Sequence, residues 1–143
     1  MSRGFSLIEL LLAMAMAAIL LLIAYPGWGA LRDRIAVNRA VDLLVAAHAR
    51  ARLIAASEQR ASLLALTADS LVLRVPESEA DTVERWRAPG PLQDGVSVTG
   101  MPKLVRFAPS GATLGAANAT YELSRGVARR QVVVSRYGRI RVN

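Results

Sequence analysis

The sequence predicts an α+β protein in which one long N-terminal helix packs on a small antiparallel β-sheet. Two observations lead to this fold class. Apolar residues first form an uncharged run and then recur at steps of three or four, which is helical spacing. From residue 62 onward, short apolar segments alternate with polar positions and are separated by glycine and proline. A sheet with an apolar face needs a cover, which the amphipathic part of the helix supplies.

The helix is predicted over residues 5 to about 58, and its first part is long enough to cross a membrane. Residues 10–31 form a run of 22 residues without a charge, whereas a bilayer core needs about 20 apolar residues. We expect the run to be retained, because a secretory signal has an apolar region of only about 7 to 15 residues followed by a small-residue cleavage site. Pro26 lies in the run and should kink or locally melt the helix. We therefore assign 5–31 as a transmembrane segment and 32–58 as its amphipathic continuation.

The amphipathic continuation carries one apolar stripe that should face the sheet. Arg39, Asp42 and Arg50 lie off this stripe, and His48 borders it. We interpret His48 as a residue at the edge of the packing seam and not as a metal ligand. The stripe consists of Val37, Val41, Leu44, Ala47, Ala51 and Ile54.

Residues 59–143 are expected to form a β-rich globular domain. Two stretches read as loops: residues 76–91, which are charged and rich in proline, and residues 109–118, which are mostly small. The expected strands are 62–66, 70–75, 96–98, 104–107, 120–123, 131–135 and 139–142.

Charge is distributed unevenly along the chain. The net charge is +7, and the whole excess lies in residues 103–143, because residues 1–102 carry equal numbers of basic and acidic side chains. Such asymmetry indicates a polyanionic partner or an anionic membrane surface. A soluble basic face remains an equally good interpretation of composition alone.

The composition gives little support to an enzyme or a metal protein. The chain has no cysteine and a single histidine, so thiolate and multi-histidine sites are excluded, and no cofactor is expected. The acidic stretch 77–81 could bind Ca²⁺ through carboxylate oxygens. It lacks the glycine of a known calcium loop, so we favour a solvated loop there.

The sequence RGFSLIEL at residues 3–10 resembles the prepilin processing signal of type IV pilins and type II secretion pseudopilins. The resemblance implies that a prepilin peptidase removes the leader, residues 1–4, by cutting after Gly4, and that Phe5 is then N-methylated. Pro26 is the twenty-second residue counted from Phe5, where many pilins carry a proline. The resemblance also implies a single-pass protein of the bacterial inner membrane. Its C-terminal domain would be extracytoplasmic, and its helix would enter a filament core with other subunits.

Glu9 is the one charge in the apolar segment that follows the leader. A charged side chain at the centre of a membrane helix costs about 2.5 to 3.5 kcal/mol on insertion scales. In filaments of the family that it resembles, the corresponding carboxylate is thought to meet the N-terminal amine of a neighbouring subunit. Glu9 is therefore predicted to set the register of assembly. The alternative is a carboxylate tolerated near the lipid headgroups.

The last 40 residues resemble the GspH/FimT family of minor pilins and pseudopilins. The resemblance rests on FAPSG at 107–111, QVVVS at 131–135 and GRIR at 138–141. Some members bind DNA during natural transformation through a Gly-Arg-x-Arg motif, which implies double-stranded DNA as a partner. The candidate contacts are Arg129, Arg130, Arg136, Arg139 and Arg141.

The spacing of the arginines supports a phosphate-binding face. On a strand, Arg139 and Arg141 point to one side while Ile140 and Val142 point to the core. Arginine suits bidentate contact with phosphate. Tyr137 could stack on a base, although packing on the sheet is the more ordinary role for it. A protein partner and a merely solvated strand face remain open as alternatives.

Overall fold

The computed structural model describes residues 6–67, 69–78, 81–100, 104–115 and 118–143. The chain forms two compact units, Met1–Arg32 and Asp33–Asn143. Gly4 and Phe5, at the expected cleavage site, lie outside the described residues.

The first unit consists of the beginning of helix α1, which spans Leu7–Glu58 over 52 residues. Its large apolar side chains are exposed all round, from Leu7 to Leu31. A helix that is apolar on every side needs a lipid or protein environment. Among the described residues, no single helix meets the criteria of length and apolar composition for a membrane span. The two segments of α1, Leu7–Ile23 and Gly27–Glu58, meet these criteria when they are considered together as a pair. The side chain of Pro26 is not described, and the kink expected there stays a prediction.

In the second unit, the remainder of α1 buries the predicted stripe. Val37, Leu44, Ala47 and Ala51 are all almost fully buried, and Ile54 is partly buried against the same core. The off-stripe residues Arg39, Asp42 and Arg50 are exposed. The helical period therefore identified the packing face of this part of α1 correctly.

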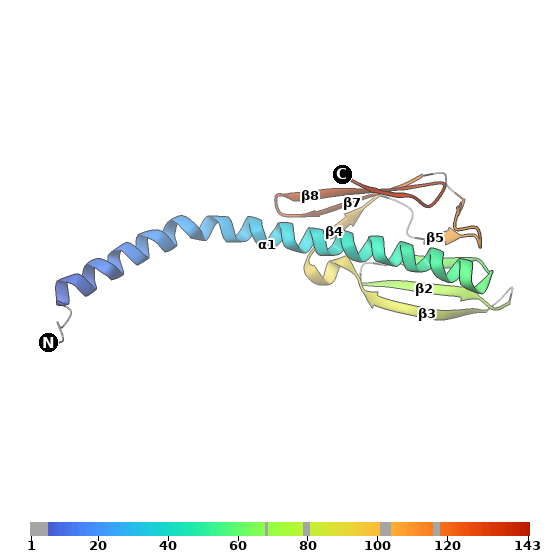
Figure 1. The fold of residues 1–143 in the computed structure, drawn as a ribbon, viewed down its shortest axis with the longest axis horizontal. Coiled ribbons are helices and arrows are strands. Elements are labelled where there is room, and N and C mark those ends of the chain that lie inside the picture. Colours follow the sequence, from blue (N-terminus) through green and yellow to red (C-terminus); the bar gives the residue numbers. More distant parts are fainter. Residues whose placement is uncertain (1–5, 68, 79–80, 101–103, 116–117) are drawn as a thin grey trace. The chain divides into compact units, whose positions relative to one another are not determined.

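Within the described residues, nine antiparallel strands form two sheets, where the sequence predicted one, and Figure 1 shows α1 running between strands of both. The first sheet has the order β3-β2-β1-β5-β6 and the second has the order β4-β7-β8-β9. The α+β class and the helix-on-sheet packing are confirmed. Alternation reveals strands but not their partners, because pairing is decided by tertiary contacts. The strands are β1 Ser62–Leu66, β2 Ser70–Pro76, β3 Thr82–Pro89, β4 Ser97–Thr99, β5 Leu104–Phe107, β6 Thr113–Leu114, β7 Asn118–Arg125, β8 Ala128–Ser135 and β9 Ile140–Val142.

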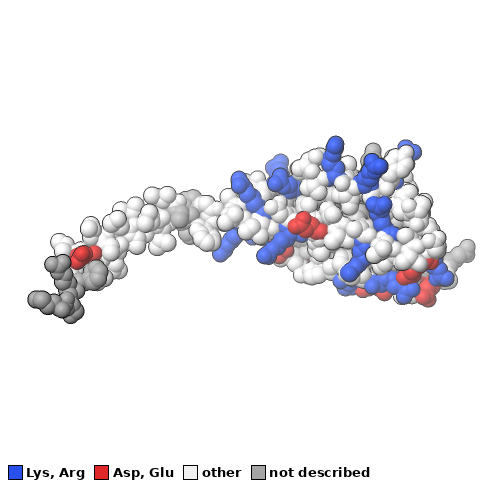
Figure 2. Space-filling model, viewed as in Figure 1, with Lys and Arg blue, Asp and Glu red and all other residues white. Residues whose placement is uncertain are grey.

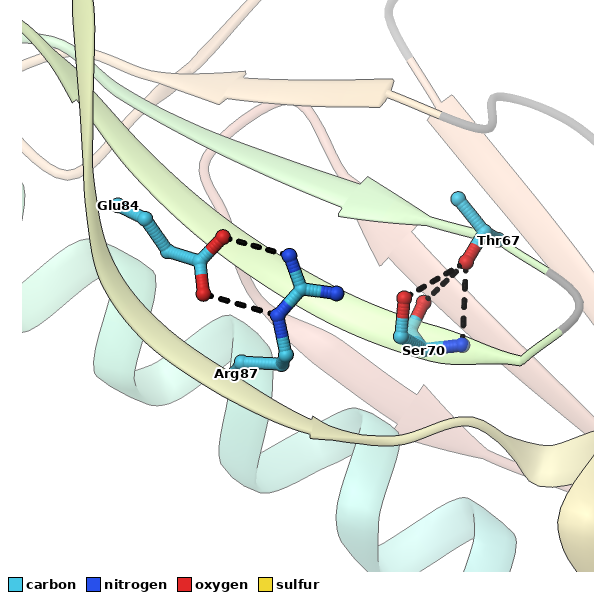
Figure 3. A network of polar contacts seen from close by, with 4 residues as sticks. All are labelled: Thr67, Ser70, Glu84 and Arg87. Carbon is cyan, nitrogen blue, oxygen red and sulfur yellow. Dashed lines mark hydrogen bonds and ion pairs between the residues drawn. The ribbon is translucent and has the colours of Figure 1, made fainter.

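The predicted loop 76–91 is wrong over most of its length. It contains strand β3, Thr82–Pro89, and is followed by a 3-10 turn, Pro91–Asp94. Its charged side chains suit an edge strand, where charges discourage pairing with another chain. Arg87 makes two hydrogen bonds to Glu84, of 2.9 and 2.7 Å, on this strand (Figure 3).

Strand β3 is also tied to the helix through its charges. Arg85 pairs with Glu58 at 3.1 Å between Nε and Oε1. Arg50 lies over the Trp86 ring, 5.3 Å from its centroid. The charged stretch that suggested a loop is therefore an edge strand, β3, whose side chains contact α1. In the same sheet, the Thr67 hydroxyl donates to the Ser70 carbonyl at 2.8 Å, at the turn between β1 and β2 (Figure 3).

His48 is a core residue, which corrects its predicted place at the edge of the seam. It is 1% exposed, and its ring lies edge-on to Phe107 and Tyr121, with centroids 5.9 and 5.7 Å away. Its Nδ1 donates to the Leu44 carbonyl at 2.8 Å. Two sheets cover a wider arc of the helix than one, so a residue that borders the stripe becomes enclosed.

The buried His48 should make the globular unit sensitive to mild acid. Burial lowers its pKa from 6.5, and the hydrogen bond to Leu44 opposes this only in part. The unfolded chain then binds more protons, so this contribution to stability is complete above about pH 6.5 and is lost as the pH falls. We expect the melting temperature of the fragment 33–143 to decrease when the pH is lowered from 8 to 5. The decrease should be smaller in His48→Leu, whatever the absolute stability of that variant. The same decrease in both proteins would contradict this role of His48.

Candidate functional site

The first described residues of the chain form a helix cap that involves Glu9. Its Oε2 lies 3.4 Å from the backbone nitrogen of Ser6, which donates to it. The Ser6 carbonyl accepts from the backbone nitrogens of Glu9 and Leu10 at 3.0 and 3.2 Å. Glu9 thus occupies the third helical position of a cap that begins at Ser6.

This capping contact was not predicted from the sequence, although the sequence contains its signature. Ser followed three residues later by Glu, just before an apolar run, is the signature of a capping box. The contact gives the Glu9 carboxylate a partner within its own chain. An acidic group in the first turn also interacts favourably with the helix dipole.

The candidate arginine residues Arg136 and Arg139 lie on the turn that joins β8 to β9. The turn is closed by hydrogen bonds from Gly138 N to the Ser135 carbonyl and from Ser135 N to the Arg139 carbonyl, both 2.8 Å. The Ser135 hydroxyl accepts from Arg139 N at 3.1 Å. The Arg136 carbonyl accepts from both the backbone nitrogen and the hydroxyl of Thr113, at 3.0 and 2.9 Å. The backbone that carries these arginines is therefore held from both sides.

A third support comes from α1. Arg52 donates from Nη1 to the Gly138 carbonyl at 3.1 Å. Gly138 is buried with φ +70°, and a Cβ placed there would lie 2.6 Å from the Gly111 carbonyl oxygen. Only glycine fits this conformation and this close approach. The structure of the turn therefore explains why the first residue of the Gly-Arg-x-Arg motif is glycine.

The pairing of β8 with β9 decides where the arginines face. Arg141 lies opposite Val133, and Ile140 lies opposite Val134, which is a buried core residue. Because faces alternate along a strand, Arg139 and Arg141 lie on the side of the sheet away from the core. Both are exposed. Ile140 packs against the core as expected, but Val142 is 45% exposed, because β9 is the edge strand.

The candidate DNA contacts and Tyr137 do not all lie together in one compact cluster. Tyr137 is in the turn but is 72% exposed, so the expected packing on the sheet is wrong. Arg129 and Arg130 start β8, and Arg136 follows its end. Seven residues of strand correspond to about 23 Å. Arg129–Arg130 and Arg136 therefore lie at opposite ends of β8, and Arg141 lies on β9 beside β8, opposite Val133.

None of these five arginines forms an ion pair in the part of the chain that the structure describes. The ion pairs that are present involve Arg85, Arg87 and Arg125. Figure 2 shows basic side chains spread over the visible face of the globular unit, with acidic ones confined to few places. The described residues also contain no group of three potential metal ligands.

Comparison with known proteins concerns both the N-terminal motif and the fold of the chain. The prokaryotic N-terminal methylation motif matches residues 1–25. A crystal structure of the type IV minor pilin FimU of Pseudomonas aeruginosa superposes with a TM-score of 0.60 at 22% identity, covering 74% of this chain and 91% of that one. The chain has a type IV pilin fold. A second crystal form of FimU gives a TM-score of 0.63 at 21% identity, covering 75% of this pilin-like chain and 87% of that one. The sequence has no match among curated proteins.

Proposed function

We propose that the chain is a non-enzymatic minor type IV pilin or pseudopilin. A prepilin peptidase would cut after Gly4, and Phe5 would be methylated. Residues 5–31 would anchor the subunit in the inner membrane and then enter the filament core. The observation that carries the proposal is the methylation motif at residues 1–25 on a chain whose globular unit has a pilin fold. Assembly at or near the tip of a pilus or a type II secretion pseudopilus follows from the resemblance to minor pilins.

The processing step has a direct test. Intact-mass measurement of the protein from its native membrane should show the loss of residues 1–4 and the addition of one methyl group. The same protein from cells without prepilin peptidase should keep Met1. Recovery of the uncut chain from cells that contain the active peptidase would refute the proposal.

Cleavage would give the Glu9 carboxylate a second possible partner. In the uncut chain this carboxylate accepts from Ser6 N. After cleavage, the amine of Phe5 becomes a cation at the start of the helix, and a neighbouring subunit supplies another. An ion pair relieves the cost of both charges in an apolar surrounding. We propose that the capping contact holds Glu9 until the neighbour's amine replaces it.

The second candidate function is that of a DNA receptor, supported by the turn between β8 and β9. Hydrogen bonds to Thr113 and Arg52 hold its backbone, and it presents Arg136 and Arg139, with Arg141 beyond. Guanidinium groups that are carried on a fixed backbone and have no acidic partners suit phosphate contacts that do not depend on base sequence. Arg129 and Arg130 would contact the backbone farther along the duplex.

DNA binding should depend on salt in a defined way. If Arg136, Arg139 and Arg141 alone each neutralise one phosphate, the slope of log K against log salt for the fragment 33–143 should be about −2.7, and further contacts from Arg129 and Arg130 would bring it to about −4.5. Binding should fall in the non-specific range, at about 10⁻⁴ to 10⁻⁶ M. The double change Arg139→Gln with Arg141→Gln should weaken binding to all sequences alike and reduce the slope by about two.

Titration with labelled duplex at several salt concentrations measures both quantities. The matched control is Arg39→Gln with Arg60→Gln, which removes two exposed arginines elsewhere and should leave the slope almost unchanged. Absence of binding at low salt, or equal effects of the two double variants, would remove DNA as a partner of this turn.

A further inference from the structure

A basic hollow of about 350 Å³ lies between α1 and the start of β8, at the opposite end of that strand from the turn described above. Arg34 and Asn38 line it from the helix. Val127, Arg129 and Arg130 line it from the turn between β7 and β8 and from the first residues of β8. All of these residues belong to the globular unit Asp33–Asn143.

Three arginines, Arg34, Arg129 and Arg130, are among the residues that line the hollow, and none of the lining residues carries a carboxylate. Asp33, which precedes Arg34, already pairs with Arg125 at 3.0 Å between Oδ1 and Nε. Arg125 also donates to the Asp94 carbonyl. A Cβ at Gly126, where φ is +52°, would lie 2.1 Å from Asp33 Oδ2, so the β7–β8 turn is seated closely against this carboxylate. Asp33 thus helps to fix the turn, and the charge of the hollow stays positive.

Arg130 contributes to the hollow through an unusual position. Its register partner is Leu123, which is fully buried, so alternation assigns Arg130 to the core side of the sheet. It is nevertheless exposed and lines the hollow together with Arg34 and Asn38 of α1.

We propose that this hollow binds the phosphate group of an anionic phospholipid. Guanidinium groups match phosphate oxygens in pairs, and the Asn38 amide can donate a further hydrogen bond. The volume falls at the lower end of the range of small-molecule sites, about 300 to 1,000 Å³, and accommodates a phosphodiester with part of its substituents. This inference rests on the proposed membrane anchoring.

The position of Arg34 in the chain favours a lipid as the source of the phosphate. It follows Leu31, the last residue of the uncharged run, by three residues. Three residues reach at most about 11 Å even when fully extended, so the hollow stays close to the end of the run in any arrangement. Basic groups next to a membrane segment attract anionic headgroups. Val127, on the lip of the hollow, is 77% exposed and is an apolar side chain suited to the membrane interface.

The test uses the full-length protein in nanodiscs of phosphatidylcholine, with or without phosphatidylglycerol, and native mass spectrometry to count the lipids retained after release. The hollow variant is Arg34→Gln with Arg130→Gln. The matched control is Arg39→Gln with Arg60→Gln. It removes two exposed arginines, one from α1 and one that follows α1, neither of which lines the hollow. A parallel titration with inorganic phosphate in detergent separates a soluble phosphate from a lipid.

We expect the wild-type chain and the control to retain phosphatidylglycerol in preference to phosphatidylcholine. The hollow variant should lose this preference by about tenfold or more, because hydrogen bonds to charged groups are among the stronger ones. Equal losses in both double variants, or no lipid preference in the wild type, would overturn the proposal. Inorganic phosphate that binds as tightly and depends on Arg34 would support the phosphate site and overturn its lipid source. A chain that fails to enter the nanodiscs would refute the anchoring itself, whereas one that enters without a preference would refute only the headgroup site.

Discussion

Replacement of Glu9 by alanine should yield a protein that is cleaved, held in the membrane and folded, but that no longer enters filaments. The carboxylate lies among exposed apolar side chains of the first unit and accepts a hydrogen bond only from its own Ser6 N in the described structure. In an assembled filament, loss of one member of a buried ion pair costs about 3 to 5 kcal/mol. Incorporation should therefore fall by roughly a hundredfold or more, as measured by the amount of the subunit in sheared filaments.

A second variant separates the two roles available to Glu9. Glutamine at the third helical position retains the capping contact but carries no charge. We expect Glu9→Gln to fail in assembly as Glu9→Ala does, because the ion pair needs the carboxylate. Full incorporation of the glutamine variant would assign Glu9 to helix capping, and full incorporation of the alanine variant would exclude both roles. The melting temperature of the globular unit should be the same in all three proteins.

Replacement of Gly138 by alanine should destabilise the globular unit and disturb the turn that carries Arg136 and Arg139. The residue has φ +70°, and its Cβ would lie 2.6 Å from the Gly111 carbonyl oxygen, which belongs to backbone and cannot move freely. Strained backbone conformations of this kind cost about 1 to 3 kcal/mol. For a domain of about 100 residues, such a loss lowers the melting temperature by roughly 4 to 8 °C for each kcal/mol.

Gly95→Ala provides the control for Gly138→Ala. Gly95 has nearly the same φ, +69°, but a Cβ there would make only ordinary contacts, 3.8 Å from the Arg125 guanidinium. It therefore reports the strain of the left-handed backbone alone, and Gly138→Ala should lower the melting temperature further. Equal shifts would show that the approach to Gly111 adds nothing. If the turn presents arginines to DNA, Gly138→Ala should also weaken duplex binding by the fragment 33–143 at temperatures where it remains folded.

Several parts of this protein could be predicted from local sequence because local physics decides them. The apolar run and the helical stripe through Val37, Leu44 and Ala51 follow from periodicity, since a helix must bury its apolar face. Most strands follow from alternation. The motif around Gly4, Phe5 and Glu9 was recognisable because processing signals are short and contiguous, and residues 1–25 match the methylation motif.

Other parts were decided only by tertiary structure. The charged stretch 82–89 resembles a loop, yet it pairs with β2 and forms contacts from Arg85 to Glu58 and from Trp86 to Arg50. His48 is enclosed because two sheets cover α1, and strand pairing between distant segments leaves no local pattern. The position of Arg130 beside the same hollow as Arg34 depends on how β8 lies against the helix. Sequence by itself determined the helix, most of the strands and the position of the processing signal. The partners of each charged side chain were set by long-range packing, because residues far apart in the chain meet only after folding.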